Sequence, residues 1–395
     1  MSHQVATAPY TAGIGFMKKD ALAQLQWHYE NRQAAALAQH RAGIPVVGIT
    51  SNTVPYELVR AAGYFPVLLS PPHAATPLAD EFMEPIFESG IRCIFDRVLA
   101  GDWSFLKLLI IPRTSEPQHK LFLYLSEVAR QQQSQHIPPI HLYDLLHTRS
   151  PCSNDYGLAR TDELAERLEE IAGHEFDDEA LAQAIEESNA ARVAIRQLLR
   201  LRRRTRPKLC GTEALAIIGA WNFMDRAEYA ELALQAVAEL KRRPALKGLR
   251  IMIKGFPLDH TGLHRAIEAH GAIVVAEDDW HGSRSAGRDI ALGNDLLACV
   301  FRKYYRNADS PRVFPPEAAD AWFQREVLHG IDGVVFYLPP DDDVRGWDYP
   351  RQKQFLDERG IPNMLIREEV NAPQVSSALA AQLEMFLGKL AARLE

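Results

Sequence analysis

Short apolar runs rich in β-branched residues recur in the first and last thirds of this chain, and stretches with helical spacing separate them. Runs of this length indicate buried strands, and strands that alternate with helices indicate a parallel sheet. The pattern therefore predicts an α/β fold with two Rossmann-like lobes, each built on a parallel sheet. The eight predicted strands are 45–50, 64–70, 107–114, 139–146, 249–255, 272–278, 332–339 and 362–369.

The middle of the chain, residues 155–243, has helical periodicity throughout and contains no strand candidate. A chain of 395 residues also exceeds the roughly 100–200 residues of one ordinary domain. In the first lobe we expect one long helix over 18–43 and another over about 80–99. The predicted parts are a first α/β lobe at 1–150, a helical segment at 151–245 and a second α/β lobe at 246–395.

The loops that follow the predicted strands are the first places to look for a site. In open parallel sheets, ligands bind in the crevice outside the carboxyl ends of the strands. The segments to inspect are 51–55, 113–117, 255–261, 278–284 and 339–345.

Composition argues against several classes of partner. The net charge is −7 and charged residues make up 24% of the chain, so no general attraction to nucleic acid or to a membrane surface is expected. No apolar run approaches the roughly 20 residues that span a bilayer, and the first residues lack the pattern of a signal peptide. We therefore expect a cytoplasmic protein.

Motifs for metal and nucleotide binding are missing from the sequence. The four cysteines, Cys93, Cys152, Cys210 and Cys299, show no CxxC spacing and are expected to be reduced thiols. No GxGxxG or P-loop pattern occurs. His260 and His264 have a spacing that could hold a metal, but the glutamate of HExxH is missing, so no metal site is predicted.

Three further features admit two interpretations each. The basic run at 199–208 is either a solvated helix end or a grip for coenzyme phosphates or an acidic subunit. Asp341 to Asp343 form either a solvated turn or a site for a cation or proton transfer. Trp280 and His281, before Gly282, either pack in the core or approach a ligand.

Several segments in order resemble the subunits of 2-hydroxyacyl-CoA dehydratases and benzoyl-CoA reductases, of the D-component type. The most specific is VGITSNTVPYELVRAAGYFPVLL at 47–69, with a strand, a VPEEL-like turn and a helix ending in AAG. The resemblance covers nearly the whole chain. The other segments are 186–199, 206–215, 267–284, 330–339 and 358–369.

The resemblance implies a specific assembly. Two paralogous subunits pair, an iron–sulfur cluster lies between the lobes of a subunit, and an ATP-dependent activator supplies electrons for chemistry on an acyl-CoA in anaerobic metabolism. Three cysteines hold the cluster in the family. The matching positions here are Glu84, Ser115 and one of Asp341 to Asp343, taken as Asp342, and none is a thiol. Clusters require soft thiolate ligands, so we expect none in this chain and a [4Fe–4S] cluster in the partner subunit.

Three hypotheses follow for function. In the first, the chain is a subunit of a dehydratase-like or reductase-like complex, and its cluster-free site shapes the pocket for a CoA thioester. In the second, it is a non-catalytic structural or regulatory paralog. In the third, Glu84, Glu116 and the 341–343 carboxylates replace the cluster as metal ligands or acid–base groups. The residues expected to contact substrate are Ser51, Asn52, Thr261, Ser283 and Arg284.

Overall fold

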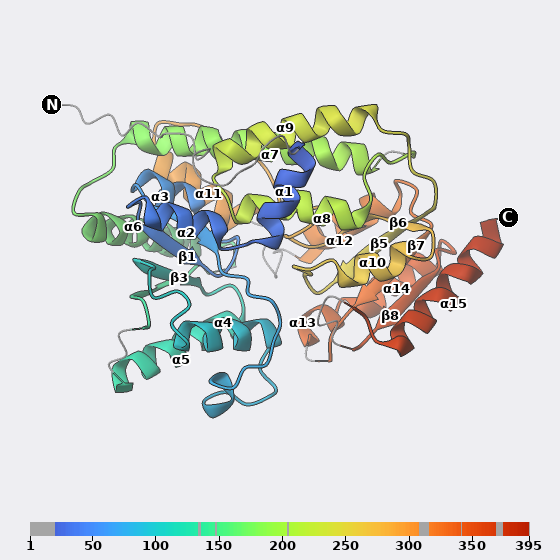
Figure 1. Cartoon of the computed structure of the whole chain (residues 1–395), viewed down its shortest axis with the longest axis horizontal. Coiled ribbons are helices and arrows are strands. Elements are labelled where there is room, and N and C mark those ends of the chain that lie inside the picture. The colour runs from blue at the N-terminus through green and yellow to red at the C-terminus, as the bar shows by residue number, and fades with distance from the viewer. Residues whose placement is uncertain are drawn as a thin grey trace.

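The computed structural model contains two four-stranded parallel sheets, as the sequence predicts (Figure 1). It describes residues 20–132, 136–146, 148–203, 205–307, 316–340, 342–368 and 374–394. The first lobe holds β1 (Val46–Ile49), β2 (Phe65–Leu68), β3 (Leu108–Pro112) and β4 (Ile140–Tyr143). The second lobe holds β5 (Leu249–Gly255), β6 (Ala272–Glu277), β7 (Gly333–Tyr337) and β8 (Asn363–Ile366).

Both sheets have the same strand order. The first runs β2-β1-β3-β4 and the second β6-β5-β7-β8, with all neighbours parallel. In each sheet the order reverses at the first strand, between β1 and β3 and between β5 and β7. Such a reversal opens a crevice at the carboxyl ends of the two strands, because their connections leave in opposite directions. The fold therefore provides two crevices, one for each lobe.

Helices cover the sheets and fill the middle of the chain. The helices in and around the first lobe are α1 (Ala21–Glu30), α2 (Ala34–Arg41), α3 (Tyr56–Ala61), α4 (Ser89–Leu99) and α5 (Glu116–Gln132). Those of the helical segment are α6 (Pro151–Ala172), α7 (Asp178–Arg203), α8 (Gly211–Gly219) and α9 (Arg226–Arg242). Those that follow are α10 (Gly262–Glu268), α11 (Leu296–Asn307), α12 (Pro316–Val327), α13 (Asp343–Gly346), α14 (Tyr349–Asp357) and α15 (Ser377–Leu394).

Two predicted helices of the first lobe are shorter than the sequence suggested. The helix expected over 18–43 is two helices, because α1 ends at Glu30 and the side-chain amide of its C-cap residue, Asn31, donates to the Trp27 carbonyl at 2.9 Å. The helix expected over 80–99 begins only at Ser89, after one 3₁₀ turn at Ala79–Glu81. Pro85 has no backbone N–H to continue a helix. Residues 82–88 are therefore a loop.

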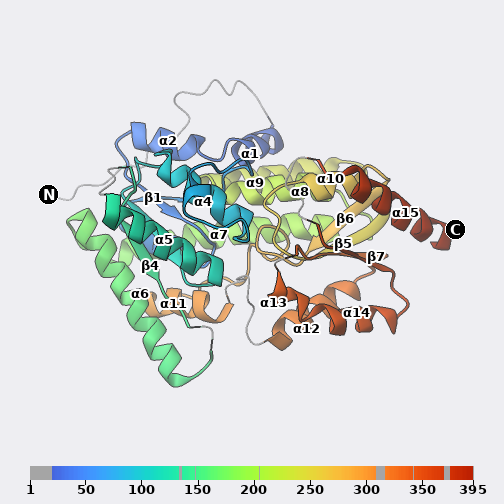
Figure 2. The ribbon, with the colours of Figure 1, turned by 90° about the horizontal axis from the view of Figure 1, so that it is seen from below.

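Apolar cores connect these elements. One continuous cluster of buried side chains extends from the first sheet into α6 to α9 and α11. The second sheet has a separate core on each face: Figure 2 shows α10 and α15 on one side of it and α12 and α14 on the other. The predicted boundaries at residues 150 and 245 stay a prediction. Among the described helices, none combines the length and apolar character that crossing a bilayer requires.

The helix α7 is connected to both lobes by buried ion pairs. Arg192 Nη2 lies 2.6 Å from Glu57 Oε1 of α3, and Arg202 Nη1 lies 2.6 Å from Glu277 Oε2 at the end of β6. All four side chains are almost entirely buried. Glu57 also accepts a hydrogen bond from the Tyr304 hydroxyl of α11 at 2.6 Å. In Figure 1, α7 runs along both lobes, with β1 and β3 at one end and β5 to β7 at the other.

Replacing one arginine of these pairs tests their contribution. In Arg202→Met, Glu277 would be left buried without its guanidinium partner, and we expect the free energy of unfolding to fall by about 3–5 kcal/mol at pH 7. The matched control is Arg200→Met, since Arg200 is exposed on the same helix. Urea unfolding followed by circular dichroism measures both variants, and equal stabilities would contradict this role.

The same pair predicts a pH dependence. Burial acts to raise the pKa of Glu277, but Arg202 and His264 outweigh it and lower this pKa to about 2. The stabilisation is therefore present above the unfolded pKa of about 4.3 and is lost as the pH falls toward 2. We therefore measure the free energy of unfolding between pH 2 and pH 7. It should decrease less steeply with falling pH in Arg202→Met than in the wild type.

Candidate functional site

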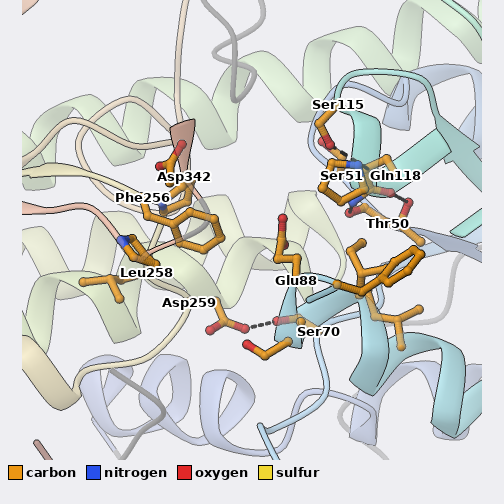
Figure 3. Close-up of a pocket in the computed structure, with 18 of the residues that line it drawn as sticks. Thr50, Ser51, Ser70, Glu88, Ser115, Gln118, Phe256, Leu258, Asp259 and Asp342 are labelled. Atoms are coloured by element: carbon orange, nitrogen blue, oxygen red, sulfur yellow. Dashed lines mark hydrogen bonds between the residues drawn. The ribbon is translucent and has the colours of Figure 1, made fainter. Parts of the chain in front are cut away.

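A cavity of about 620 Å³ lies between the lobes, where the carboxyl ends of the two sheets meet (Figure 3). Its first-lobe wall follows β1, β2 and β3, and its second-lobe wall follows β5, β6 and β7. The first-lobe lining is Thr50, Ser51, Leu68 to Pro71, His73, Ile86 to Ile91, Ile94, Ser115 to Gln118 and Lys120. The second-lobe lining is Phe256 to His260, Trp280, His281, Tyr337, Pro339, Pro340, Asp342, Val344 and Arg345.

Hydroxyl and amide groups form the first-lobe wall at the crevice between β1 and β3. Thr50 Oγ1 donates to Gln118 Oε1 at 2.6 Å, and Gln118 Nε2 donates back to the Thr50 carbonyl at 3.1 Å. Ser115 Oγ accepts from the Gln118 backbone N–H at 3.4 Å at the start of α5. These bonds hold the end of β1 against the first turn of α5.

The loop before α4 supplies a third side of the cavity. Glu88 is the N-cap residue of α4, and its carboxylate lies between the two walls in Figure 3. Phe87, Ile91 and Ile94 add apolar surface beside it. Because Pro85 delays the start of the helix, this loop reaches the cavity instead of continuing α4.

The second-lobe wall combines rings with a charged pair. Asp342 Oδ2 lies 2.8 Å from Arg345 Nη1, so the described aspartate of the 341–343 run already has a cationic partner. Phe256 follows β5 directly, after Gly255 with φ 135°. A side chain at Gly255 would place its Cβ 2.0 Å from the Tyr337 carbonyl oxygen, so only glycine allows this close approach of β5 and β7.

A polar contact joins the two lobes at one end of the cavity. Arg32 Nη1 lies 2.8 Å from Asp259 Oδ2 and 2.6 Å from Ser70 Oγ, and the Ser70 hydroxyl also contacts Asp259 (Figure 3). Burial acts to raise the pKa of Asp259, but Arg32 and the nearby histidines hold it well below its usual range. Asp259 is therefore a carboxylate at neutral pH, and it connects the second lobe to Ser70 of the first.

Three histidines line this end of the cavity. His73 Nδ1 lies 3.2 Å from Ser89 Oγ, and His260 Nδ1 accepts from the Gly262 N–H at 3.4 Å. The His281 ring stacks on Trp280 with centroids 3.6 Å apart. Burial lowers the pKa of His260 and of His281 to about 4, so both rings are neutral at pH 7.

The predicted site residues separate into two groups. Ser51, Ser115 and Asp342 line the cavity. Glu84 is exposed outside it, and its backbone carbonyl accepts from Arg92 at 2.8 Å. The other predicted residues that do not line the cavity are Asn52, Thr261, Ser283 and Arg284.

Ser283 and Arg284 are engaged behind the wall. Ser283 Oγ accepts from the Glu277 N–H at 3.1 Å, and Arg284 Nη1 lies 2.8 Å from Asp278 Oδ1. The sequence reasoning missed His73, Ser70 and the loop before α4. The end of β2 obeys the same rule as the other strands, so that rule could have found Ser70 and His73.

The cavity lining does not fit an iron–sulfur cluster. Its side chains offer hydroxyl, carboxylate and imidazole groups, and none of the four cysteines is among them. Cys93 Sγ contacts the Ala74 carbonyl at 3.7 Å, and Cys210 caps α8. In the described part of the chain, no three histidine, cysteine or acidic residues are grouped so that they could hold a metal. Thiolates, the ligands that clusters require, are missing from this lining.

The carboxylates of the third hypothesis do not form one group either. Glu116 is 72% exposed and pairs with Lys120 at 3.6 Å, while Asp342 pairs with Arg345. Asp341 lies outside the described residues. Glu116 and Asp342 therefore pair with separate cations and do not share a site.

Comparison with known proteins bears out the resemblance seen in the sequence. The family described as 2-hydroxyglutaryl-CoA dehydratase, D-component, matches residues 51–390. The chain is 22% identical to the (R)-phenyllactyl-CoA dehydratase beta subunit of Clostridium sporogenes, over 86% of this chain and 91% of that protein. It is 25% identical to (R)-2-hydroxyglutaryl-CoA dehydratase, subunit beta, of Acidaminococcus fermentans, over 90% and 95%. Lactoyl-CoA dehydratase subunit beta of Anaerotignum propionicum is 20% identical, over 87% and 92%.

The Arg32 contact can be tested by removing the guanidinium. In Arg32→Met the Asp259 carboxylate would lose its cationic partner, and we expect the free energy of unfolding to fall by about 2 kcal/mol, less than for a fully buried pair, because Arg32 and Asp259 are partly exposed. The control is Arg41→Met, since Arg41 is exposed at the end of α2. Chemical denaturation compares the two, and unchanged stability in Arg32→Met would exclude this role.

Proposed function

Because this chain belongs to the 2-hydroxyglutaryl-CoA dehydratase D-component family, we propose that it is a subunit of a 2-hydroxyacyl-CoA dehydratase-type complex. In this proposal the cavity between the lobes binds the CoA thioester. The observation that carries the proposal is the position of this cavity, at the meeting point of both sheet crevices in a chain that matches dehydratase beta subunits over nearly their whole length.

The chemistry of the lining supports an acyl thioester as ligand. A cavity of about 620 Å³ is within the range of small-molecule sites, so it suits the acyl group and part of the pantetheine arm. Phe87, Phe256 and Leu258 provide apolar contacts for the arm. Thr50, Ser51 and Ser115 provide hydroxyl groups, which can hydrogen-bond to thioester and amide groups.

We assign the [4Fe–4S] cluster to a partner subunit of the same family. The support is the donor set of the described lining, which lacks the thiolates that a cluster requires. When bound in that partner, the cluster would supply single electrons, with an ATP-dependent activator as their source. Ser115 and Asp342 line the cavity, and the sequence resemblance assigns them to positions of cluster cysteines in the family. They contribute polar contacts to substrate in this proposal.

Anaerobic purification tests the assignment of the cluster. The chain is produced alone and together with a cluster-bearing paralog, and iron and sulfide are measured in each preparation. We expect iron only in the heteromer. Iron and sulfide bound by the isolated chain would overturn the cluster-free proposal. A stable heteromer that binds no acyl-CoA in this chain's cavity would support the non-catalytic paralog.

A charge at the cavity mouth tests the site of thioester binding. Ile86 lines the cavity and is 68% exposed, so Ile86→Asp changes the mouth without disturbing the core. The added carboxylate should repel the anionic coenzyme and weaken binding of (R)-phenyllactyl-CoA about 2- to 5-fold, as expected for a partly screened charge. Isothermal titration calorimetry on the heteromer measures the affinity.

The matched control is Val193→Asp, because Val193 is exposed on α7 and does not line the cavity. This variant carries the same change in net charge and should bind as the wild type does. Equal affinities of the two variants would place the thioester elsewhere.

A further inference from the structure

The loop after β6 places one histidine ring in the cavity wall in a fixed position. The Gly282 N–H donates to Asp279 Oδ1 at 2.7 Å, and the Arg284 N–H donates to the Asp279 carbonyl at 3.1 Å. Leu258 N, from the loop after β5, lies 3.5 Å from Asp279 Oδ2. Asp279 therefore holds its own loop in a tight turn and connects it to the loop after β5.

Gly282 keeps this turn in close contact with the buried ion pair at the end of β6. A Cβ at Gly282 would lie 2.5 Å from Glu277 Oε2, the atom that Arg202 contacts. The backbone next to His281 is thus fixed against the Arg202–Glu277 pair. A ring carried on such a backbone is positioned before any ligand arrives.

The ring itself is held by stacking. His281 packs on Trp280 with centroids 3.6 Å apart and an angle of 30° between the ring planes. The side chain is 8% exposed, and it lines the cavity. Stacking uses the face of the His281 ring, so the two ring nitrogens, which lie at the ring edge, are not involved in the stack.

Hydrogen bonding distinguishes His281 from the three histidines nearest to it. His73 contacts Ser89, His260 accepts from Gly262, and His264 lies 2.7 Å from Glu277 Oε1. No described residue makes a hydrogen bond with the His281 ring. A neutral imidazole has one donor and one acceptor, and a ligand in the cavity that His281 lines can pair with both.

We propose that His281 recognises the 2-hydroxyl group of the acyl-CoA through its unsatisfied ring nitrogens. This inference rests on the proposed function and deepens it. A hydroxyl both donates and accepts, as a neutral imidazole does, so the two groups are complementary. The neighbouring charges suit a neutral ligand group, because Asp259 is already paired with Arg32 and the adjacent His260 ring is neutral at pH 7. The relatives named above are dehydratases of phenyllactyl-CoA, 2-hydroxyglutaryl-CoA and lactoyl-CoA, whose acyl groups all carry this hydroxyl.

The test compares two ligands that differ only in the hydroxyl: (R)-phenyllactyl-CoA and 3-phenylpropanoyl-CoA. Calorimetry on the full chain, with its partner, gives the ratio of their affinities. In the wild type we expect the hydroxylated ligand to bind about 2- to 10-fold more tightly, the range of one neutral hydrogen bond. In His281→Phe the stack on Trp280 is retained and the nitrogens are lost, so the ratio should fall to about 1, within the error of the measurement.

Two further variants separate recognition from a structural role. His281→Asn keeps a donor and an acceptor and should retain part of the preference. His329→Phe is the matched control, because His329 is exposed after α12, and it should keep the wild-type ratio. Loss of stability alone would weaken both ligands equally and leave the ratio unchanged.

The outcomes are distinguishable. A wild-type preference that persists in His281→Phe, or two ligands that bind the wild type equally, would overturn the role of His281 and leave thioester binding intact. If neither ligand binds the complex, the proposed function fails, and the role of His281 fails with it.

Discussion

The relative position of the two lobes depends on two buried arginines of one helix. Arg192 and Arg202 lie on α7, about 15 Å apart along its axis at 1.5 Å per residue. One pairs with Glu57 at the start of α3, the other with Glu277 at the end of β6. Because each carboxylate belongs to a different lobe, the helix sets the spacing between them. Buried ion pairs contribute little net stability, but an unpaired buried charge is costly, so they favour one arrangement over its alternatives.

The cavity follows from that arrangement. Both lobes have the same strand order, so each presents a crevice at the carboxyl ends of its first and third strands. When α7 holds the sheets with these edges facing, the two crevices become one shared cavity. The Arg32 contact with Asp259 and Ser70 then joins the lobes at one end of it. A ligand that contacts both walls would stabilise the same arrangement, because it binds only when the lobes are correctly placed.

Sequence patterns predicted the sheets better than they predicted the site. All eight strands appear where apolar runs predicted them, and six of them, all but β4 and β8, are almost entirely buried, as expected for strands of a parallel sheet. No element was predicted between residues 279 and 331, where α11 and α12 lie. The helix α11 packs mainly against α6 and α7, far earlier in the chain. The pairing of Glu57 with Arg192 is equally non-local, and no periodicity reveals which buried arginine meets which carboxylate.

The motif EDDWHGSRS, residues 277–285, shows why site residues cannot be identified from a short stretch of sequence alone. Ser283 and Arg284 have the chemistry expected of ligand contacts, yet they serve Glu277 and Asp278 behind the wall. Trp280 and His281 lie inside the turn that the Asp279–Gly282 hydrogen bond closes, and these two residues line the cavity. A residue type states what a side chain can bind. The carboxylate of Glu277, held by a helix some seventy residues earlier in the chain, helps to decide which side chains of this motif face the cavity.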